Sequence, residues 1–189
     1  MTEATQVKPG AWLTGRSVYK RSLSYSNVPT MDARVGRAID LASKEAELLD
    51  RKDYGDWQEL YTEDGIYVVP IDREVEDFSN TLNLIFDNDA MRRSRVTRMT
   101  EGYAISAVDA ATTTRTLGRF VPAEVGDTEV RLRASQVVIA YKRGRHDLWA
   151  GEVEYLVRLG PTSTQDRLAL KVIRLIDSDS ELPASGFLL

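Results

Sequence analysis

The stretch YGDWQELYTEDGIYVVP, Tyr54 to Pro70, contains the change from helix to strand around which the predicted fold is built. Asp53, just before it, is typical of a helix N-cap, and the apolar positions that follow lie on one side of a short helix. Asp64-Gly65 is typical of a turn. We interpret the IYVV that follows as a short strand, which Pro70 ends because proline has no N–H to donate to a sheet.

The carboxylates in this region could form a catalytic pair or could mark the ends of secondary structure. Asp53 and Asp56 suit the first turn of a helix, where negative charge meets the positive end of the helix dipole. Glu63 and Asp64 suit a turn. Because secondary structure accounts for these acids without any chemistry, we expect them to be structural. A catalytic carboxyl would also need a pKa raised by burial.

A longer helix precedes this stretch. Asp32 is a candidate N-cap, and an apolar stripe follows at spacings of four, three, four and three residues, ending near Arg51. The stripe consists of Val35, Ile39, Ala42, Ala46 and Leu49. Residues 1–30 show no steady period. We expect them to form an irregular N-terminal arm, either docked on a neighbouring molecule or without fixed structure, ahead of a single domain at 31–189.

An arginine-rich helix is expected at about residues 87–100. It carries Arg92, Arg93, Arg95 and Arg98. These side chains could form a solvated face, or a charged surface for a partner, since arginine suits fixed ion pairs at interfaces. The candidate partner contacts in this segment are Asp87, Arg92, Arg93 and Arg98.

From about residue 112 onward the apolar period changes to two, which predicts strands. We expect four of them, at about 114–124, 129–142, 147–159 and 166–176, with turn-forming sequences between the later ones. Helices followed by such a run of strands predict an α+β fold, with the helices on one face of an antiparallel sheet.

The two faces of the hairpin at 129–159 differ. If paired residue numbers sum to an odd value, as with Val137 opposite Glu152, one face is apolar and should meet the helices. That face holds Val130, Leu132, Ala134, Val138, Ala140, Trp149, Val153, Tyr155 and Val157. The other face can form cross-strand ion pairs at its far end, but near the tip it carries Val137, Ile139 and Tyr141.

The strand at 166–176 is apolar on both sides. A monomer would normally leave one sheet face polar. We therefore expect an obligate oligomer in which another chain covers this face, with Val137, Ile139 and Tyr141 as candidate contacts.

Composition excludes several classes of function. The net charge of −4 argues against a nucleic-acid partner, and no run approaches the ~20 apolar residues that cross a membrane. The N-terminus has no signal-peptide core, so we expect a cytoplasmic protein. With no Cys and one His, His146, the chain cannot form a thiolate metal site or one built on two imidazoles. We expect it to contain no catalytic, cofactor or metal site.

In their order along the chain, these motifs resemble the small (beta) subunits of aromatic-ring-hydroxylating dioxygenases. EAELLDRKDYGDWQELYTEDGIYVVP is similar to the opening signature of that family, and IFDNDAMRRSRVTRMTEGYAIS to its acidic pair and arginine-rich helix. AGEVEYLVRL, RLALKVIRLIDSD and GFLL resemble its closing strands and apolar C-terminus, with Lys171 at a position that is usually basic. The signature positions matched are Glu45, Ala46, Leu48, Leu49, Asp50, Trp57, Leu60, Tyr61, Asp64, Gly65, Tyr67 and Pro70.

The resemblance implies a cone-shaped, nuclear transport factor 2-like (cystatin-like) fold. It also implies assembly with a large (alpha) subunit, usually three of each, and with copies of this chain. The large subunit would hold a Rieske [2Fe–2S] cluster and a mononuclear iron. It would add both atoms of O₂ to an aromatic ring in hydrocarbon catabolism, with electrons from NAD(P)H arriving through separate electron-transfer components. The role implied for the small subunit is structural.

Two other functions stay open. A stand-alone dehydratase, isomerase or cyclase of the same fold would need an acid or base in the cone, and its candidates are Asp64, Tyr67, Glu152 and Glu154. A non-catalytic binding module would hold a small apolar ligand or a protein partner there.

Overall fold

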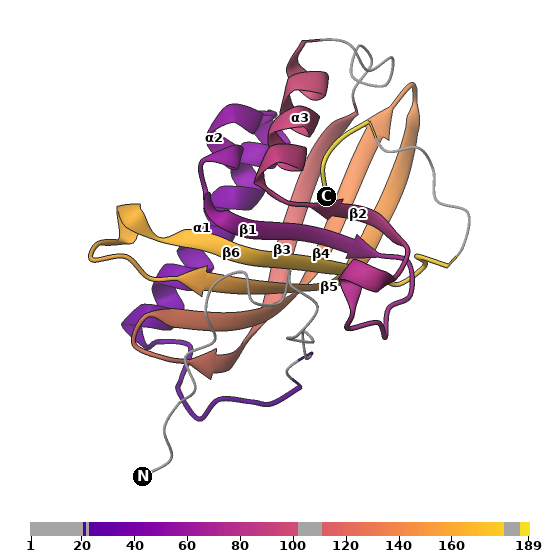
Figure 1. Cartoon of the computed structure of the whole chain (residues 1–189). Coiled ribbons are helices and arrows are strands. Elements are labelled where there is room, and N and C mark those ends of the chain that lie inside the picture. Colours follow the sequence, from indigo (N-terminus) through magenta and orange to yellow (C-terminus); the bar gives the residue numbers. More distant parts are fainter. Residues whose placement is uncertain (1–20, 22, 102–110, 180–185) are drawn as a thin grey trace.

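The computed structural model describes residues 21, 23–101, 111–179 and 186–189, and in this part of the chain the helices lie on one side of a six-stranded sheet (Figure 1). The helices are α1 (Ala33–Arg51), α2 (Tyr54–Gln58) and α3 (Asp89–Thr100). The strands are β1 (Tyr61–Pro70), β2 (Asn83–Asp87), β3 (Thr112–Val125), β4 (Glu129–Lys142), β5 (Arg145–Arg158) and β6 (Arg167–Leu175). Two single turns of 3-10 helix are η2 (Phe78–Asn80) and η3 (Ser163–Gln165).

The sheet has the order β2-β1-β6-β5-β4-β3. β1 and β6 are parallel, and every other neighbouring pair is antiparallel. Figure 1 shows β3, β4 and β5 bending along their length, so that the sheet curves around α1 and α2. The predicted α+β fold, with helices packed on a curved and mostly antiparallel sheet, is confirmed. The short edge strand β2 was not expected from the sequence.

Helix α1 begins and ends at residues suited to those positions. The Asp32 side chain accepts a hydrogen bond from the backbone N–H of Arg34 at 2.9 Å, which confirms the predicted N-cap. Lys52 ends the helix in the left-handed conformation, with φ of 62°. Of the predicted stripe, all members except Ile39 are buried, and the helix packs against β3 and β4.

The turn expected at Asp64-Gly65 is instead an irregularity within β1. The register with β6 shifts between Tyr61 and Ile66, while the strand continues to Pro70. A Cβ at Gly65 would lie 2.8 Å from the Leu168 backbone oxygen, so the two strands can approach only because this residue is glycine. The sequence indicated a position that requires glycine, which is confirmed, but the predicted turn was wrong.

The β4–β5 hairpin confirms the predicted faces. Its paired residues sum to an odd number, although Val137 lies opposite Ala150 and not opposite Glu152. All nine residues predicted for the apolar face are buried. The two-residue loop is Arg143-Gly144, where both residues have positive φ (51° and 79°), as a tight right-twisted hairpin requires.

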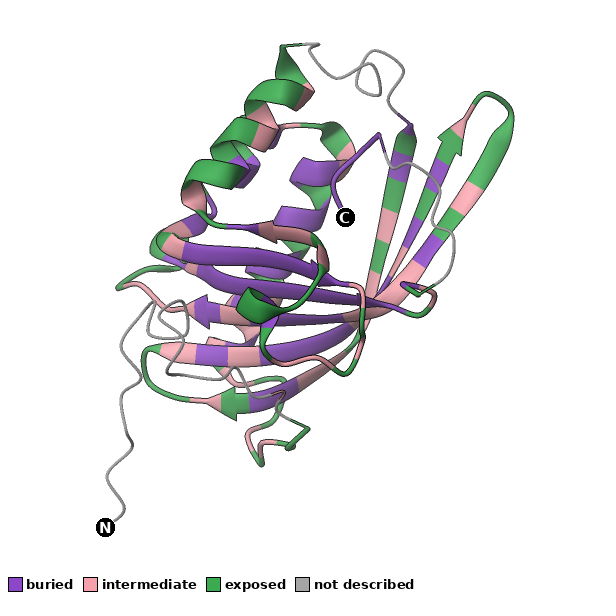
Figure 2. Ribbon diagram, turned by 45° about the vertical axis from the view of Figure 1, so that its right-hand side comes forward, coloured by how far each residue is buried: buried purple, intermediate pink, exposed green. Residues whose placement is uncertain are grey.

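The other face of the sheet is covered in part by the chain itself. Ile66 and Val68 of β1 form a buried cluster with Leu170, Val172 and Phe78. Phe78 belongs to η2, in the connection between β1 and β2. The expectation that another chain is needed to cover the second face of β6 is therefore wrong for these residues. Figure 2 shows buried residues along the middle of the sheet and exposed residues at the ends of β3, β4 and β5.

Most of the predicted N-terminal arm, residues 1–20 and 22, lies outside the described residues. The described end of the arm contacts β3, where the Ser26 N–H donates to the Pro122 oxygen at 2.9 Å. None of the helices in the described ranges is long and apolar enough to cross a membrane.

Candidate functional site

The concave side of the sheet contains a fully buried ion pair. Glu45 lies on the inward face of α1, four residues before Leu49, and Lys171 lies on the inward face of β6 beside Tyr67 and Tyr155. Lys171 Nζ is 2.7 Å from Glu45 Oε1 and 2.8 Å from Oε2, and both side chains are 0% exposed. This contact joins the first long helix to the last strand.

The pair is surrounded by aromatic groups that complete its contacts. Trp57 Nε1 donates to Glu45 Oε1 at 2.8 Å. The ammonium of Lys171 also lies over the rings of Tyr67 and Tyr155, 5.7 and 5.8 Å from their centres. Burial lowers the pKa of Lys171, and the Glu45 carboxylate opposes that shift. The two side chains are mutual counterions in a space that excludes water, an arrangement typical of a structural contact.

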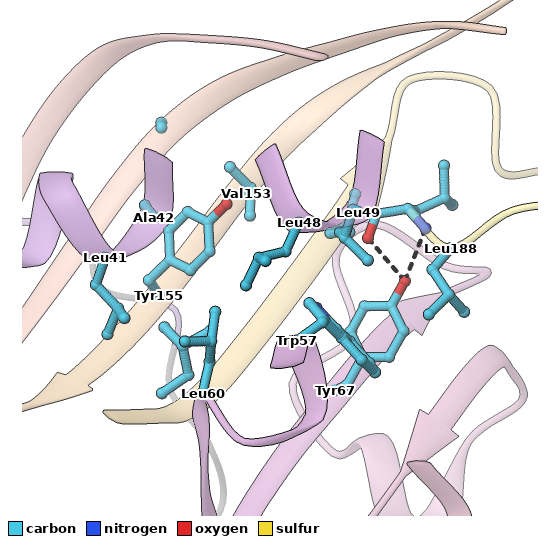
Figure 3. Close-up of a cluster of buried hydrophobic side chains, with 14 of the residues drawn as sticks. Leu41, Ala42, Leu48, Leu49, Trp57, Leu60, Tyr67, Val153, Tyr155 and Leu188 are labelled. Atoms are coloured by element: carbon cyan, nitrogen blue, oxygen red, sulfur yellow. Dashed lines mark hydrogen bonds between the residues drawn. The ribbon is translucent and has the colours of Figure 1, made fainter. Parts of the chain in front are cut away.

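Residues 186–189 lie against this pair. The Tyr67 hydroxyl donates to the Leu189 oxygen at 3.0 Å and accepts from the Leu189 N–H at 3.1 Å (Figure 3). Lys171 Nζ donates to the same Leu189 oxygen at 3.0 Å. Burial, followed by the nearby Glu45 carboxylate, raises the pKa of Tyr67 well above its usual value, so this phenol stays protonated.

The candidate catalytic acids do not meet at one site. Asp64 binds the Arg158 guanidinium with both oxygens, at 2.6 and 3.1 Å. Glu152 pairs with Arg21 at 2.7 Å, and Glu154 pairs with Arg131 at 2.9 Å. Glu152 and Glu154 lie on the sheet face turned away from the helices, whereas the remaining candidate, Tyr67, lies inside the cone. Each of these carboxylates is therefore paired with an arginine, whereas a catalytic pair would require pairing with a second candidate.

The pKa values of two of these acids agree with that conclusion. Burial alone would raise the pKa of Asp64, but hydrogen bonds from Arg158 and Thr62 outweigh it and lower the pKa. The same balance, with Arg21 as donor, lowers the pKa of Glu152. A general acid at neutral pH needs the opposite shift. Within the described ranges, no group of three or more His, Cys, Asp or Glu side chains is placed to hold a metal ion.

Two of the predicted partner contacts, Arg92 and Asp87, are instead buried inside the chain. Arg92 donates to the backbone oxygens of Gly65 and Thr62, and its guanidinium lies 4.3 Å from the centre of the Tyr61 ring. Asp87, also buried, accepts from Arg95 Nη2 at 2.9 Å. These residues attach α3 to β1 and β2, so they have no surface to offer a partner.

The other candidates remain on the surface. Arg93 is exposed and pairs with Asp89 of its own helix at 2.9 Å, and Arg98 is exposed at the end of α3. On the hairpin, Ile139 and Tyr141 are 42% and 48% exposed, and Val137 is half-buried.

Apolar residues of neighbouring strands extend this exposed surface. Leu148, paired with Ile139, is 63% exposed, and Ile176 is 60% exposed where its N–H donates to the Ala150 oxygen. We call Ile139, Tyr141, Leu148 and Ile176 the hairpin-tip patch. Sequence reasoning missed Ile176, although the two-residue period of β6 continues to it. The single histidine, His146, lies beside the patch, with its ring 4.9 Å from that of Tyr141.

One family model and several solved structures match this chain. The family model described as ring hydroxylating beta subunit matches residues 44–179. The beta subunit of benzoate 1,2-dioxygenase from Burkholderia mallei ATCC 23344 is 18% identical, with a TM-score of 0.65, over 85% of this chain and 100% of that one. A chain of naphthalene 1,2-dioxygenase with indole bound in its active site is 18% identical, with a TM-score of 0.70, over 88% and 91%.

The fold itself is shared more widely. An NTF2-like protein with a cystatin-like fold from Novosphingobium aromaticivorans is 17% identical, with a TM-score of 0.55, over 76% of this chain and 82% of that chain. A search of curated protein sequences gave no match.

Proposed function

The chain belongs to the ring-hydroxylating beta subunits, the small subunits of aromatic-ring-hydroxylating dioxygenases, and we propose that it supports an iron-bearing large subunit without taking part in the chemistry. The observation that carries this proposal is the pairing of each candidate catalytic carboxylate with an arginine. The remaining titratable candidate, Tyr67, donates its hydroxyl hydrogen bond to the Leu189 oxygen. This arrangement also argues against a stand-alone dehydratase or isomerase.

The donors of this chain do not fit the iron centres of the reaction. A Rieske cluster requires two Cys and two His, and a mononuclear non-haem iron site of the usual kind requires two His and a carboxylate. The chain has no Cys and a single His, which is exposed on the hairpin. We propose that both centres lie in the large subunit and that their electrons come from NAD(P)H. We also propose that the assembly is cytoplasmic.

We propose the hairpin-tip patch, with Val137 at its edge, as the contact with the large subunit. Four large apolar side chains are exposed together on one face of the sheet there, whereas single, scattered apolar residues on a surface need no explanation. Arg93 and Arg98, on α3, are a second candidate contact, suited to acidic groups on a large subunit or on another copy of this chain. Assembly as three large and three small subunits remains an expectation from the family.

Co-expression with a large subunit tests the proposed surface. We expect Leu148→Lys and Ile139→Lys to abolish co-purification of the large subunit while lowering the melting temperature of the isolated chain only slightly, because both side chains are partly exposed. Leu82→Lys is the matched control, since Leu82 is 82% exposed on the β1–β2 connection. Full assembly of both patch variants would overturn the assignment of this surface.

A further inference from the structure

The last residues of the described chain occupy the interior of the protein. Phe187, Leu188 and Leu189 are all buried, and they belong to the main core cluster together with residues of α1 and the sheet. They form neither helix nor strand. In the described parts of the chain, no backbone–backbone hydrogen bond ties them to a neighbouring strand. Something other than sheet pairing therefore holds them in place.

Side chains from three strands hold the backbone of this segment. Tyr67 of β1 uses its one hydroxyl both to accept from the Leu189 N–H and to donate to the Leu189 oxygen. Lys171 of β6 donates to the same oxygen at 3.0 Å. Arg115 of β3 donates through Nη2 to the Leu188 oxygen. Side chains thus satisfy polar main-chain groups of this buried segment that no strand pairs in the described part of the chain.

The Phe187 side chain packs against an aromatic ring. The ring of Phe187 meets Trp149 edge to face, with centres 5.8 Å apart and planes at 86°. The Arg115 guanidinium lies 5.9 Å from the centre of the same ring. Arg115 therefore contacts both the side chain of Phe187 and the backbone of Leu188, which fixes the register of the segment.

The groups that hold the segment are themselves held by other parts of the chain. Glu45 fixes the Lys171 ammonium from α1. Asp50, at the end of α1, accepts from the Arg115 guanidinium and, at 2.8 Å, from the Arg115 backbone N–H. Neither support involves residues 186–189. The binding groups are therefore preorganised, and such preorganisation lowers the cost of binding a ligand.

We infer that the interior of the cone is a binding site for an extended apolar peptide, and that residues 186–189 are its built-in occupant. The segment closes the cone from within. It leaves and returns by a local opening, while α1 and the sheet remain folded. The emptied site takes an aromatic residue beside Trp149 and aliphatic residues beside Tyr67 and Lys171. This site is separate from the hairpin-tip patch, so the two proposals fail or succeed independently.

Hydrogen exchange of the Leu189 N–H in the full chain tests local opening. We expect this N–H to exchange with solvent at a rate that stays flat at low urea, because a local opening exposes little surface. Tyr67→Phe should raise that rate about tenfold, since it removes two hydrogen bonds. Tyr141→Phe, on the exposed hairpin, is the matched control and should leave the rate unchanged.

A second experiment tests recognition directly. We expect a chain shortened after Ser185 to bind the peptide Gly-Phe-Leu-Leu saturably, with a rise in melting temperature, and to ignore the scrambled peptide Leu-Gly-Leu-Phe. Tyr67→Phe in the shortened chain should weaken that binding about tenfold, since it removes the two hydrogen bonds between this hydroxyl and the peptide backbone.

Two results would overturn the inference. One is exchange of the Leu189 N–H that rises with urea in parallel with global unfolding at every concentration. The other is a folded shortened chain that does not respond to millimolar peptide. If the shortened chain does not fold, the urea dependence measured on the full chain decides alone.

Discussion

Glu45 of α1 and Lys171 of β6 are joined in the centre of the protein by an ion pair from which water is excluded on all sides, at 2.7 and 2.8 Å. The same ammonium reaches the Leu189 oxygen at 3.0 Å. One cation thus connects the first long helix, the last strand and the C-terminal segment. The stability of the fold should therefore depend strongly on both Glu45 and Lys171.

Removal of one partner should be far more damaging than removal of both. We expect Lys171→Met to lower the free energy of unfolding by about 3–5 kcal/mol, because it leaves the Glu45 carboxylate buried without a counterion. The double variant Glu45→Met with Lys171→Met should cost less than the sum of the single changes, since no uncompensated charge remains. Urea titrations of the isolated chain measure both. Glu47→Gln, at an exposed position of α1, is the control, and a loss below about 1 kcal/mol for Lys171→Met would contradict the structural role of the pair.

Gly65 should resist even the smallest side chain. A Cβ there would lie 2.8 Å from the Leu168 oxygen and 2.9 Å from the Thr62 oxygen, both rigid backbone atoms. We expect Gly65→Ala to destabilise the chain by about 1–3 kcal/mol, a typical cost of overpacking. Gly36→Ala in α1 is the matched control. A Cβ at Gly36 would meet nothing within 4 Å, so alanine should stabilise that helix by about 0.5–1 kcal/mol. Equal effects of the two changes would argue against the close approach of β1 and β6.

The Asp64–Arg158 pair should make stability depend on pH in the acid range. The folded state lowers the pKa of Asp64 through Arg158, against the opposing effect of burial. The ion pair therefore contributes its full stabilisation at pH values above the unfolded pKa of Asp64, about 4. This stabilisation is lost as the pH falls through the lower pKa of Asp64 in the folded state. We expect Asp64→Asn to cost up to about 1 kcal/mol at pH 7, and this difference from wild type should shrink towards pH 3.

Urea midpoints measured from pH 7 to pH 3 test this dependence. Glu63→Gln, at the exposed neighbouring position, supplies the control and should lie close to wild type throughout. A difference between Asp64→Asn and wild type that is constant over the whole pH range would exclude the ion pair as its cause.

Two arginines of α3 should behave differently although both look solvent-facing in the sequence. Arg92 is buried and donates to backbone oxygens of β1, whereas Arg98 is exposed. We expect Arg92→Met to destabilise the chain by about 2–4 kcal/mol, because it leaves buried carbonyl oxygens without donors. Arg98→Met should change stability by less than about 0.5 kcal/mol. Thermal melting of the two variants side by side distinguishes a structural arginine from a surface one.

Local patterns were sufficient for much of the fold. The α1 stripe and the faces of the β4–β5 hairpin follow from periods of 3.6 and two residues, which any single segment displays. The start of β1 could not be predicted in this way. Its irregularity at Gly65 depends on the approach of Leu168, which is more than one hundred residues away in the chain.

The contacts inside the protein could not be predicted from the sequence for the same reason. Glu45 and Lys171 both stood out in the sequence, but nothing local indicates that residues 126 apart form a pair. Arg92 was misjudged because an arginine on a polar helix is normally solvated. Here its guanidinium satisfies backbone oxygens that the irregularity in β1 leaves unpaired by the sheet. Such roles become visible only when the strands are placed next to the helix.

The iron content of this chain, purified alone and as a complex with a co-expressed large subunit, is the most direct test of its proposed role. We predict no stoichiometric iron and no ring dihydroxylation by the isolated chain, with iron and activity appearing only in the complex. Stoichiometric iron bound to the isolated chain, or turnover of an aromatic substrate by it, would contradict a purely supporting role.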